Sequence, residues 1–302
     1  MGRLMRLIVT GATGFIGKHL IESAQQHFQI VCLTRSHETS RKSQNVSFVQ
    51  TDYELDSLKD IFREGDVLIH LAGQRLTKNE ANPKLLSFIE SNVKITENLL
   101  IAACEAKIRQ VVLASTIGVY SDIDGMPYTE DIITHPSTIY GLSKLMGEQL
   151  VNYYCMKNSI KSTIFRLSQC FGIGEKDSPV LMRFIKQAKE KQQLKAQDNE
   201  FYLDEIYVKD VVEVMLLSIR KEVEGTFNVG GGKAYSILNM AETVNSVFDN
   251  VHNINVISSK KIRNESNFLS LKKIETQLNW SPKFDLEKAL IDMRDSYDIN
   301  KE

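Results

Sequence analysis

The sequence has few cysteines and prolines, and each scarcity removes a class of protein. Its four cysteines, Cys32, Cys104, Cys155 and Cys170, lie far apart without a C-x-x-C pair, which is not the spacing of a zinc site or a disulfide framework. With only 5 prolines and 16 glycines among 302 residues, the composition is not that of a collagenous or disordered chain. We therefore expect a globular protein of the reducing cytoplasm without a metal site.

The sequence also has no excess of positive or negative charge, and it contains no long apolar run. Lysine and arginine total 37, aspartate and glutamate total 38, and the formal net charge is −1, so a nucleic-acid or anionic-membrane partner is disfavoured. No stretch approaches the roughly 20 apolar residues that a membrane-spanning helix needs. At roughly 150 residues per domain, the length predicts about two domains, or one large α/β body with an addition.

Short runs rich in β-branched residues alternate with longer amphipathic stretches in the first half of the chain, which is typical of βαβ units. The predicted strands cover residues 4–10, 30–34, 46–50, 67–71, 111–115 and 163–167, and the predicted helices include 16–26, 83–107 and 138–156. Unbroken apolar runs such as Val67-Leu68-Ile69 suit parallel strands that are covered on both faces. We therefore predict an α/β fold with a Rossmann-type, doubly wound parallel sheet.

The pattern loosens after Arg166 and predicts a second, smaller lobe of mixed α/β structure. Its expected helices cover 180–195, 211–221, 237–248 and 286–297, its expected short strands cover 205–208, 226–229 and 256–258, and residues 196–200 form a polar segment. The expected first domain covers 1–167, with 204–222 returning to it. The smaller lobe then takes 168–203 and 223–302.

The loop Gly11-Ala12-Thr13-Gly14-Phe15-Ile16-Gly17 follows a predicted strand and opens a predicted helix. In a dinucleotide-binding loop, the first glycine permits the tight turn, the second lets the backbone approach a pyrophosphate, and the third allows helix and strand to pack closely. The N–H groups at the start of the helix, including those of Thr13, Phe15 and Ile16, would hold the phosphates. The alternative is an ordinary flexible turn, which the position at the first βα crossover disfavours.

The end of the second predicted strand bears on the choice of nicotinamide cofactor. Arg35-Ser36 stands there, followed by Arg41-Lys42, and no carboxylate occupies the place where one would accept from a ribose 2′-hydroxyl. NADP(H) is therefore the preferred cofactor and NAD(H) the alternative. A solvated basic loop explains the same charges without a ligand.

Two further stretches complete the expected cofactor site. Asp52, just after the third strand, could place a carboxylate beside an adenine amino group, although such an aspartate commonly caps a helix or forms a turn. Leu71-Ala72-Gly73 ends the fourth strand with small residues, where a backbone must run close to a flat ligand.

Tyr140 and Lys144 begin a predicted helix and share one of its faces, because they are four residues apart. A phenol has a pKa near 10, and a neighbouring ammonium lowers it towards the range useful for acid–base catalysis. Ser115 and Thr116 end a strand, where open α/β sheets place ligands. Thr116 and Tyr140 could therefore both donate to a substrate carbonyl oxygen, although a hydroxyl here also suits a turn or cap.

These residues together resemble the extended short-chain dehydrogenases/reductases, the NAD(P)-dependent nucleotide-sugar epimerase, dehydratase and reductase family. The resemblance covers nearly the whole chain and runs through Gly11 to Gly17, Leu71-Ala72-Gly73, Asn92, Ser115-Thr116, Val119-Tyr120, Tyr140 with Lys144, and residues 166–172, 204–210, 227–230 and 280–282. It implies that Tyr140 is the catalytic acid/base. It also implies that Lys144 modulates the pKa of Tyr140 and binds the nicotinamide ribose, that Thr116 orients the sugar, and that Ser115 belongs to the cofactor site. By the same resemblance, the first domain binds the dinucleotide and the smaller lobe binds substrate.

Departures from the family pattern narrow the expected reaction. Ile117-Gly118 stands where 4,6-dehydratases carry an Asp-Glu pair, and Gly118 where the epimerase-reductases that make GDP-fucose carry a cysteine. With dehydration and that route of epimerisation disfavoured, the remaining family reaction is hydride transfer at one sugar carbon, most often C4. The expected activity is NADPH-dependent reduction of a nucleotide-activated 4-keto-6-deoxyhexose. A nucleotide-sugar 4-epimerase with retained NAD is one alternative, and a non-catalytic dinucleotide-sensing protein is another.

The substrate contacts are less well defined. Leu203 replaces an arginine that grips phosphates in the family, and Gln169 replaces an asparagine. The candidate contacts are Gln74, Arg75, Thr116, Gln169, Lys260 and Arg263. The resemblance also implies a homodimer that packs through the helices predicted at 83–107 and 138–156.

Overall fold

The structure is a computed structural model that describes residues 4–36, 43–76, 84–121, 125–176, 180–198, 201–252, 254–258 and 267–299. The chain divides into two compact units, of which the first comprises residues 1–121, 133–166 and 212–227 and the second comprises 122–132, 167–211 and 228–302. The division expected from the sequence differs from this one chiefly at 122–132, 204–211 and 223–227.

The first unit is built on a seven-stranded sheet with the order β10-β6-β5-β4-β1-β2-β3. Its strands are β1 (Arg6–Thr10), β2 (Gln29–Thr34), β3 (Val46–Gln50), β4 (Val67–His70), β5 (Gln110–Thr116), β6 (Lys161–Leu167) and β10 (Gly225–Val229). Parallel pairing joins β1 to β2 and β4, β2 to β3, and β4 to β5. The strand order therefore reverses beside β1, and open α/β sheets bind ligands at such a switch point. The predicted doubly wound sheet is confirmed.

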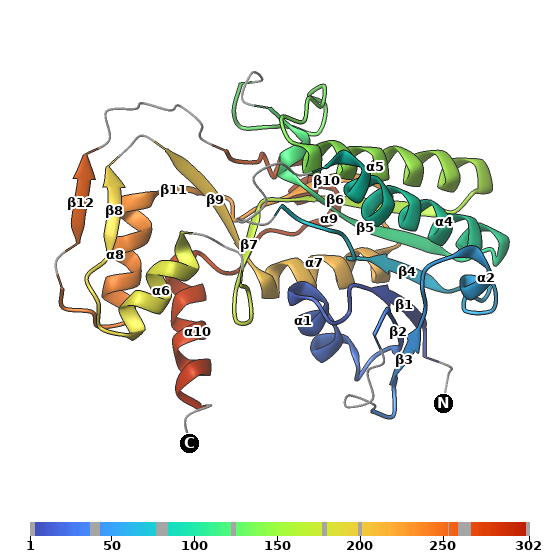
Figure 1. Cartoon of the computed structure of the whole chain (residues 1–302), viewed down its shortest axis with the longest axis horizontal. Helices are drawn as coiled ribbons and strands as arrows, with labels where there is room; N and C mark the ends of the chain where they lie inside the picture. The colour runs from blue at the N-terminus through green and yellow to red at the C-terminus, as the bar shows by residue number, and fades with distance from the viewer. Residues whose placement is uncertain are drawn as a thin grey trace. The chain divides into compact units, whose positions relative to one another are not determined.

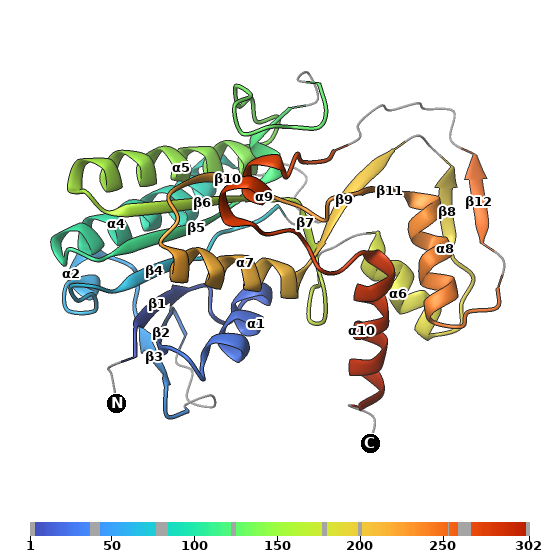
Figure 2. The same ribbon diagram turned by 180° about the vertical axis from the view of Figure 1, so that it is seen from behind.

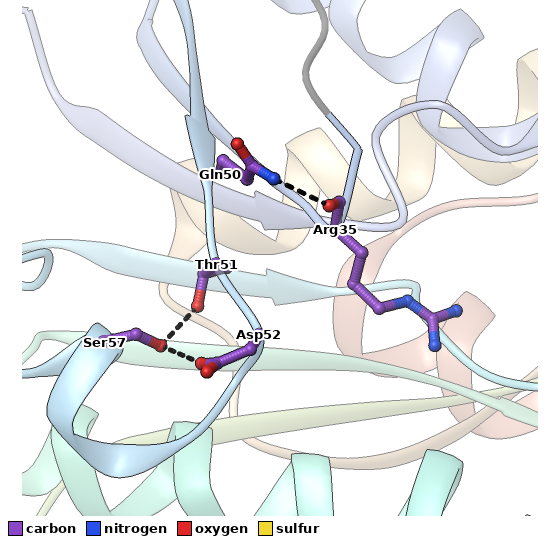
Figure 3. Close-up of a pocket in the computed structure, with 5 residues that line it drawn as sticks. All are labelled: Arg35, Gln50, Thr51, Asp52 and Ser57. Atoms are coloured by element: carbon purple, nitrogen blue, oxygen red, sulfur yellow. Dashed lines mark hydrogen bonds between the residues drawn. The ribbon is translucent and has the colours of Figure 1, made fainter.

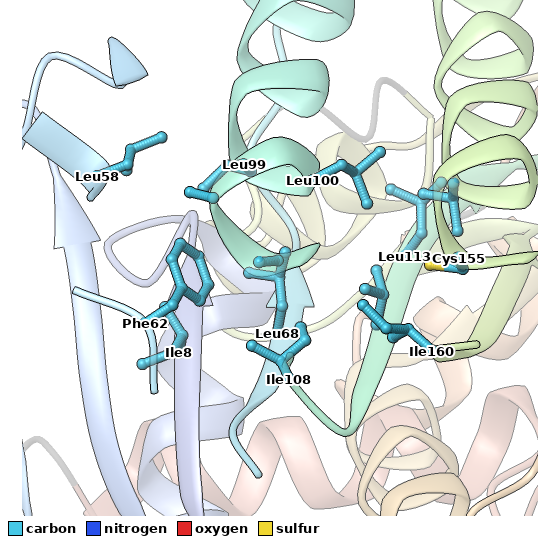
Figure 4. Close-up of a cluster of buried hydrophobic side chains, with 14 of the residues drawn as sticks. Ile8, Leu58, Phe62, Leu68, Leu99, Leu100, Ile108, Leu113, Cys155 and Ile160 are labelled. Carbon is cyan, nitrogen blue, oxygen red and sulfur yellow. The ribbon is translucent and has the colours of Figure 1, made fainter. Parts of the chain in front are cut away.

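Helices cover both faces of this sheet, which explains why its strands are apolar on both sides. In both views of the molecule α4 (Ile95–Glu105) and α5 (Ile139–Asn158) lie on one side, and α1 (Phe15–Ala24) and α7 (Val208–Lys221) lie on the other (Figures 1 and 2). The short helix α2 (Leu55–Leu58) packs against α4. Figure 4 shows the core beneath α4 and α5, where buried residues of the strands, such as Ile8, Leu68 and Leu113, meet Leu99 and Leu100.

The long helix expected at 83–107 consists of three consecutive segments, with residue 83 outside the described part of the chain. These are α3 (Leu85–Phe88), the π-helix η1 (Ile89–Lys94) and α4. A π segment widens the helix locally and is frequent at functional sites. Here it contains Asn92, which is buried.

The second unit contains two small sheets. A three-stranded sheet has the order β11-β9-β7, and a parallel pair joins β12 to β8. Its elements are β7 (Gln169–Phe171), β8 (Lys195–Asp198), β9 (Tyr202–Tyr207), β11 (Ala234–Ser236), β12 (Asn255–Ser258), α6 (Leu181–Lys189), α8 (Ile237–Val247), α9 (Lys272–Leu278) and α10 (Leu286–Ile299). The buried Asp204 carboxylate ties this unit together by accepting from the N–H groups of Gly231, over 2.7 Å, and Leu269, over 3.1 Å.

One stretch of this unit corrects the sequence prediction. The helix expected to reach residue 195 ends at Lys189, and the segment expected to be polar and irregular contains β8. Lys191 has a φ of 53°, in the left-handed region, which interrupts the helix. Beyond it, Leu194 and Ala196 are buried while Lys195 is exposed, so the chain alternates as a strand and pairs with β12.

Candidate active site

The glycine loop joins β1 to α1 at the switch point of the sheet. Gly11 has a φ of +70°, and a Cβ atom there would lie 2.7 Å from the amide nitrogen of Ala72 and 2.8 Å from the carbonyl carbon of Leu71. Only glycine fits this backbone and this approach. The loop is closed by a hydrogen bond from Gly14 N–H to the carbonyl oxygen of Gly11 over 2.9 Å. The predicted small-residue segment after β4 therefore packs directly against the glycine loop.

The first turn of α1 presents N–H groups beside this loop. Helix α1 begins at Phe15 after Gly14, with Ile16 in its first turn, and carries no acidic residue there. Thr13 and Gly14 are exposed. A helix leaves its first N–H groups without intrahelical partners and has a positive N-terminus, which suits an anion. The loop and helix start thus form a cradle that fits the pyrophosphate of a dinucleotide.

A pocket of ≈ 440 Å³ lies at the ends of β2 and β3, and five residues line it: Arg35, Gln50, Thr51, Asp52 and Ser57 (Figure 3). Gln50 Nε2 donates to the carbonyl oxygen of Arg35 over 3.2 Å. The Arg35 side chain extends away from the Asp52 carboxylate, which turns towards Ser57 (Figure 3). The predicted cofactor residues Arg35 and Asp52 therefore share one pocket.

The Asp52 carboxylate takes part in the turn before α2. It accepts from the Ser57 hydroxyl over 2.6 Å and from the Glu54 N–H over 2.9 Å. These bonds, that of Ser57 first, lower the pKa of this exposed carboxyl, which therefore stays ionised at neutral pH. The turn-forming interpretation holds, and a contact with adenine stays a prediction.

Tyr140 and Lys144 lie on successive turns of α5, whose N-cap Thr138 accepts from the Gly141 N–H over 3.0 Å. Thr116 ends β5 and caps the 3-10 helix η2 (Ile117–Val119). Burial raises the pKa of the Tyr140 phenol, while the positive charge of Arg75 and the Thr116 hydroxyl oppose this rise. The structure therefore brings Thr116 and Tyr140 together, as the sequence predicted.

Lys144 is buried, with 8% of its surface exposed. Burial lowers the pKa of its ammonium to about 8, and the Glu148 carboxylate opposes this effect. Its Nζ lies beside Gly73, 4.0 Å from the position that a Cβ would take there. A buried lysine next to the loop after β4 lies where a ligand that covers Gly73 would meet it.

Sequence reasoning gave no role to the residues that hold this arrangement. Asn92 accepts from the Gln74 N–H over 2.6 Å and donates to the Gln74 carbonyl over 3.0 Å and to Ser143 Oγ over 2.9 Å. Ser143 in turn donates to the Tyr140 carbonyl over 2.8 Å. Asn92 thus joins the loop after β4 to the catalytic helix. The family resemblance includes Asn92, and this was the available signal in the sequence.

His70 was also missed. Its ring nitrogens lie 2.6 Å from Thr10 Oγ1 and 2.8 Å from Thr96 Oγ1, so it joins β1 to α4. Burial, with a smaller contribution from the positive charge of Lys144, lowers the pKa of His70 to about 3. A neutral, doubly hydrogen-bonded imidazole therefore lies beneath the site. A histidine that ends the apolar run Val67-Leu68-Ile69 was the signal in the sequence.

The remaining predicted residues are scattered. The Ser115 hydroxyl donates to the Glu148 carboxylate, and Gln74 Oε1 accepts from Ser91 over 2.9 Å. Arg75 is exposed beside Tyr140, and Gln169 is an exposed residue of β7 in the second unit. Leu203 is buried in β9. The candidates Lys260 and Arg263, with Arg41 and Lys42, lie outside the described residues, and their roles stay predictions.

A glycine cradle lies at the switch point, a threonine ends β5, and a tyrosine and a lysine lie one turn apart on α5. This arrangement defines a dinucleotide-dependent oxidoreductase of the short-chain type. Residues 7–230 match the model of the NAD dependent epimerase/dehydratase family. The chain therefore belongs to this family of extended short-chain dehydrogenases/reductases. The expected family, an enzyme and a nicotinamide dinucleotide are thereby confirmed.

Individual relatives agree with this assignment over the full length. The chain is 30% identical to a putative UDP-glucose 4-epimerase of Methanocaldococcus jannaschii, over 94% of this chain and 95% of that protein. It is 23% identical to the dTDP-4-dehydro-6-deoxyglucose reductase of Escherichia coli, over 94% and 95% respectively. The solved UDP-N-acetylglucosamine 4-epimerase of Bacillus cereus superposes with a TM-score of 0.84 at 29% identity, covering 96% of this chain and 98% of that one.

Within the described ranges, no helix is long and apolar enough to cross a membrane. Over the same residues, no group of three or more His, Cys, Asp or Glu side chains is placed to hold a metal ion.

Proposed function

We propose that this protein is a nucleotide-sugar 4-epimerase that retains NAD through its catalytic cycle. The observation that carries the proposal is the convergence of Thr116 and Tyr140 above Lys144, while Ile117 and Gly118 follow Thr116. Neither of those two residues can transfer a proton, so the site supplies acid–base chemistry at one sugar oxygen. Likeness to proteins named as 4-epimerases favours epimerisation over net reduction.

The side chains divide the proton chemistry between them. Tyr140 removes the proton of the sugar 4-hydroxyl and returns it after the sugar has turned. Thr116 donates to the same oxygen and orients it. We assign to the Lys144 ammonium, one turn further along α5, the role of favouring the phenolate form of Tyr140. The bound cofactor supplies a reversible hydride acceptor for C4. The glycine cradle and the first turn of α1 would hold its pyrophosphate.

A reductase that uses NADPH is the second candidate, and Arg35 is the observation that favours it. Arg35 directly follows β2 and lines the pocket with Asp52, where a guanidinium suits a ribose 2′-phosphate. A reductase exchanges its cofactor at each turnover, whereas an epimerase keeps it. The two candidates therefore differ in whether external cofactor is consumed.

The deciding experiment measures cofactor content and conversion together. The purified protein is denatured and its released dinucleotide identified by chromatography. It is then incubated with UDP-glucose, UDP-N-acetylglucosamine or UDP-glucuronic acid, without added cofactor, and the products are followed by NMR. Conversion to the 4-epimer together with released NAD supports the proposal.

Two further outcomes would overturn it. Stoichiometric NADPH consumption with dTDP-4-dehydro-6-deoxyglucose, without epimerisation, would establish the reductase. Tyr140→Phe should bind NAD normally and lose at least about 100-fold in rate, in the range that a positioned acid–base group contributes. A Tyr140→Phe variant with full biological activity would favour the non-catalytic, dinucleotide-sensing alternative.

We further propose that the protein forms a homodimer through α4 and α5 and acts in the cytoplasm. Tyr153 and Met156 on α5 are 53% and 80% exposed, which leaves apolar surface for a partner helix. No disulfide joins the four cysteines, all of which the structure describes, in keeping with a reducing compartment. Sedimentation at micromolar concentration tests the dimer, and Met156→Glu should dissociate it. A monomeric wild-type protein would refute this assignment.

A further inference from the structure

A buried ion pair lies directly below the catalytic residues of α5. Glu148 follows Lys144 by four residues and Tyr140 by eight, so all three lie on one face of the helix. The Glu148 side chain is 1% exposed and that of Arg166, on β6, is 9% exposed. Arg166 holds both carboxylate oxygens: Nη2 donates to Oε2 over 2.7 Å, and Nε lies 3.1 and 3.2 Å from Oε1 and Oε2.

Two further groups fix this pair. The Ser115 hydroxyl donates to Glu148 Oε1. Arg166 Nη1 donates to the Tyr120 hydroxyl over 2.8 Å, and the guanidinium lies 5.0 Å from the centre of that ring. The pair therefore joins α5 and β6 to both ends of the segment from Ser115 to Tyr120, which contains Thr116.

A buried ion pair adds little to stability, because the loss of hydration offsets the attraction of the charges. The position of this pair indicates that it contributes to the electrostatic environment of Lys144. The Glu148 oxygens are occupied by Arg166 and Ser115, and no ion pair joins Glu148 to Lys144, both of which the structure describes. Lys144 is thus close enough to experience the negative charge of Glu148 while its Nζ stays beside Gly73.

The other charged or titratable groups around Lys144 come from β4, the loop after β4 and β6. His70 on β4 is neutral across the physiological range, since its pKa is about 3. Arg75, in the loop after β4, acts on Tyr140, and Arg166 on β6 is already paired. Glu148 is therefore the group whose charge supports the Lys144 ammonium against burial.

We propose that Glu148 is a positioning residue of the active site. Arg166 and Ser115 hold its carboxylate so that it keeps Lys144 charged without pairing with it, which leaves the ammonium available to Tyr140. The proposal rests on the proposed function for the catalytic roles of Tyr140 and Lys144. Removing the carboxylate should make Lys144 neutral at a lower pH and deprive the phenol of its cationic neighbour.

The test uses Glu148→Gln and the double variant Glu148→Gln/Arg166→Met. The single variant leaves the buried Arg166 guanidinium without its carboxylate and can fail to fold, whereas the double variant removes both charges of the pair. The matched control is Asp66→Asn/Arg6→Met. It removes another largely buried pair, in which the side chains of Arg6 and Asp66 are 12% and 3% exposed, from the opposite ends of the strands.

The first measurement does not depend on activity. The protein is labelled with ¹³Cε-lysine, the Lys144 resonance is assigned from its loss in Lys144→Arg, and its titration is followed by NMR. The Lys144 titration should move down by about 1 pH unit in Glu148→Gln, as expected for loss of one nearby charge in a partly screened site. It should move down by less in the double variant, because loss of the Arg166 charge partly offsets loss of the Glu148 charge. The control should leave it unchanged.

The second measurement is the pH profile of kcat/KM for the epimerisation. Its alkaline limb should move down with the Lys144 titration in the Glu148 variants and stay in place in the control. A Lys144 titration that does not move, with or without a lower kcat, would overturn the proposal and leave the pair a purely structural role. If no nucleotide sugar is converted by the wild type, the proposed function fails while the NMR titration still decides this inference.

Discussion

Gly141 is the point at which the catalytic helix touches the turn that follows Thr116. A Cβ atom at this position would overlap the carbonyl oxygen of Gly118 and lie 3.0 Å from its carbonyl carbon and 3.1 Å from Pro136 Cβ. Since non-bonded heavy atoms prefer about 3.5–4.0 Å, Gly141→Ala must separate the first turn of α5 from the turn of Gly118 by roughly 1 Å. That movement takes Tyr140 away from Thr116.

Misplacing reacting groups by about 1 Å costs roughly 100-fold in rate, and overpacking costs about 1–3 kcal/mol of stability. Gly141→Ala should therefore lower kcat about 100-fold and destabilise the protein, measured by NMR-followed epimerisation and by urea unfolding. The control is Gly147→Ala on the same helix, because a Cβ at Gly147 would meet no atom within 4 Å. It gains up to about 1 kcal/mol of helix propensity without a clash. Equal kcat values for the two variants would refute this account of the Gly118 contact.

Three further perturbations test other parts of the site. Gly17→Ala, whose Cβ would overlap the Gly11 carbonyl oxygen and lie 2.7 Å from Ala12 Cα, should abolish retention of NAD, and NAD released from the purified variant at the wild-type ratio would contradict this. Arg35→Asp should lower NADP affinity at least about 10-fold relative to NAD, because a carboxylate accepts from a 2′-hydroxyl and repels a 2′-phosphate; calorimetry on the apoprotein checks the ratio. In the folded protein the pKa of His70 is about 3, whereas in the unfolded chain it is about 6.5. As the pH falls below 6.5, His70 is therefore protonated in the unfolded chain only, and the free energy of unfolding decreases. This decrease amounts to about 2 kcal/mol between pH 6.5 and 5. Urea unfolding of His70→Gln at the two pH values should not show it.

The sequence could predict those parts of the site that depend on neighbouring residues. Tyr140 and Lys144 share a helix face because they are four residues apart, and this spacing is visible without a fold. The glycine loop is recognisable for the same reason, since its constraints arise between Gly11 and the start of α1. The doubly wound sheet also follows, because parallel strands buried on both faces read as continuous apolar runs.

The residues that support the site come from distant parts of the chain and could not be predicted in this way. Asn92 acts on Gln74 and Ser143, which lie 18 and 51 residues away. Glu148 is on the predicted face of α5, but its partner Arg166 is on β6 and the meaning of the pair depends on both being buried. The strand β8 was missed because its pairing with β12 depends on a register that local propensity does not determine.

At Thr116 and Asp52 the sequence offered two interpretations, a structural cap and a ligand contact, as if one excluded the other. The structure shows why the two interpretations are compatible. Thr116 Oγ1 accepts from the Gly118 N–H over 3.1 Å, which uses a lone pair of the hydroxyl and leaves its O–H hydrogen to donate elsewhere. The capping bond thus fixes the oxygen at the end of β5 and favours a donor directed at a substrate oxygen. The cap at Thr116 is therefore compatible with the substrate contact that we propose for this residue.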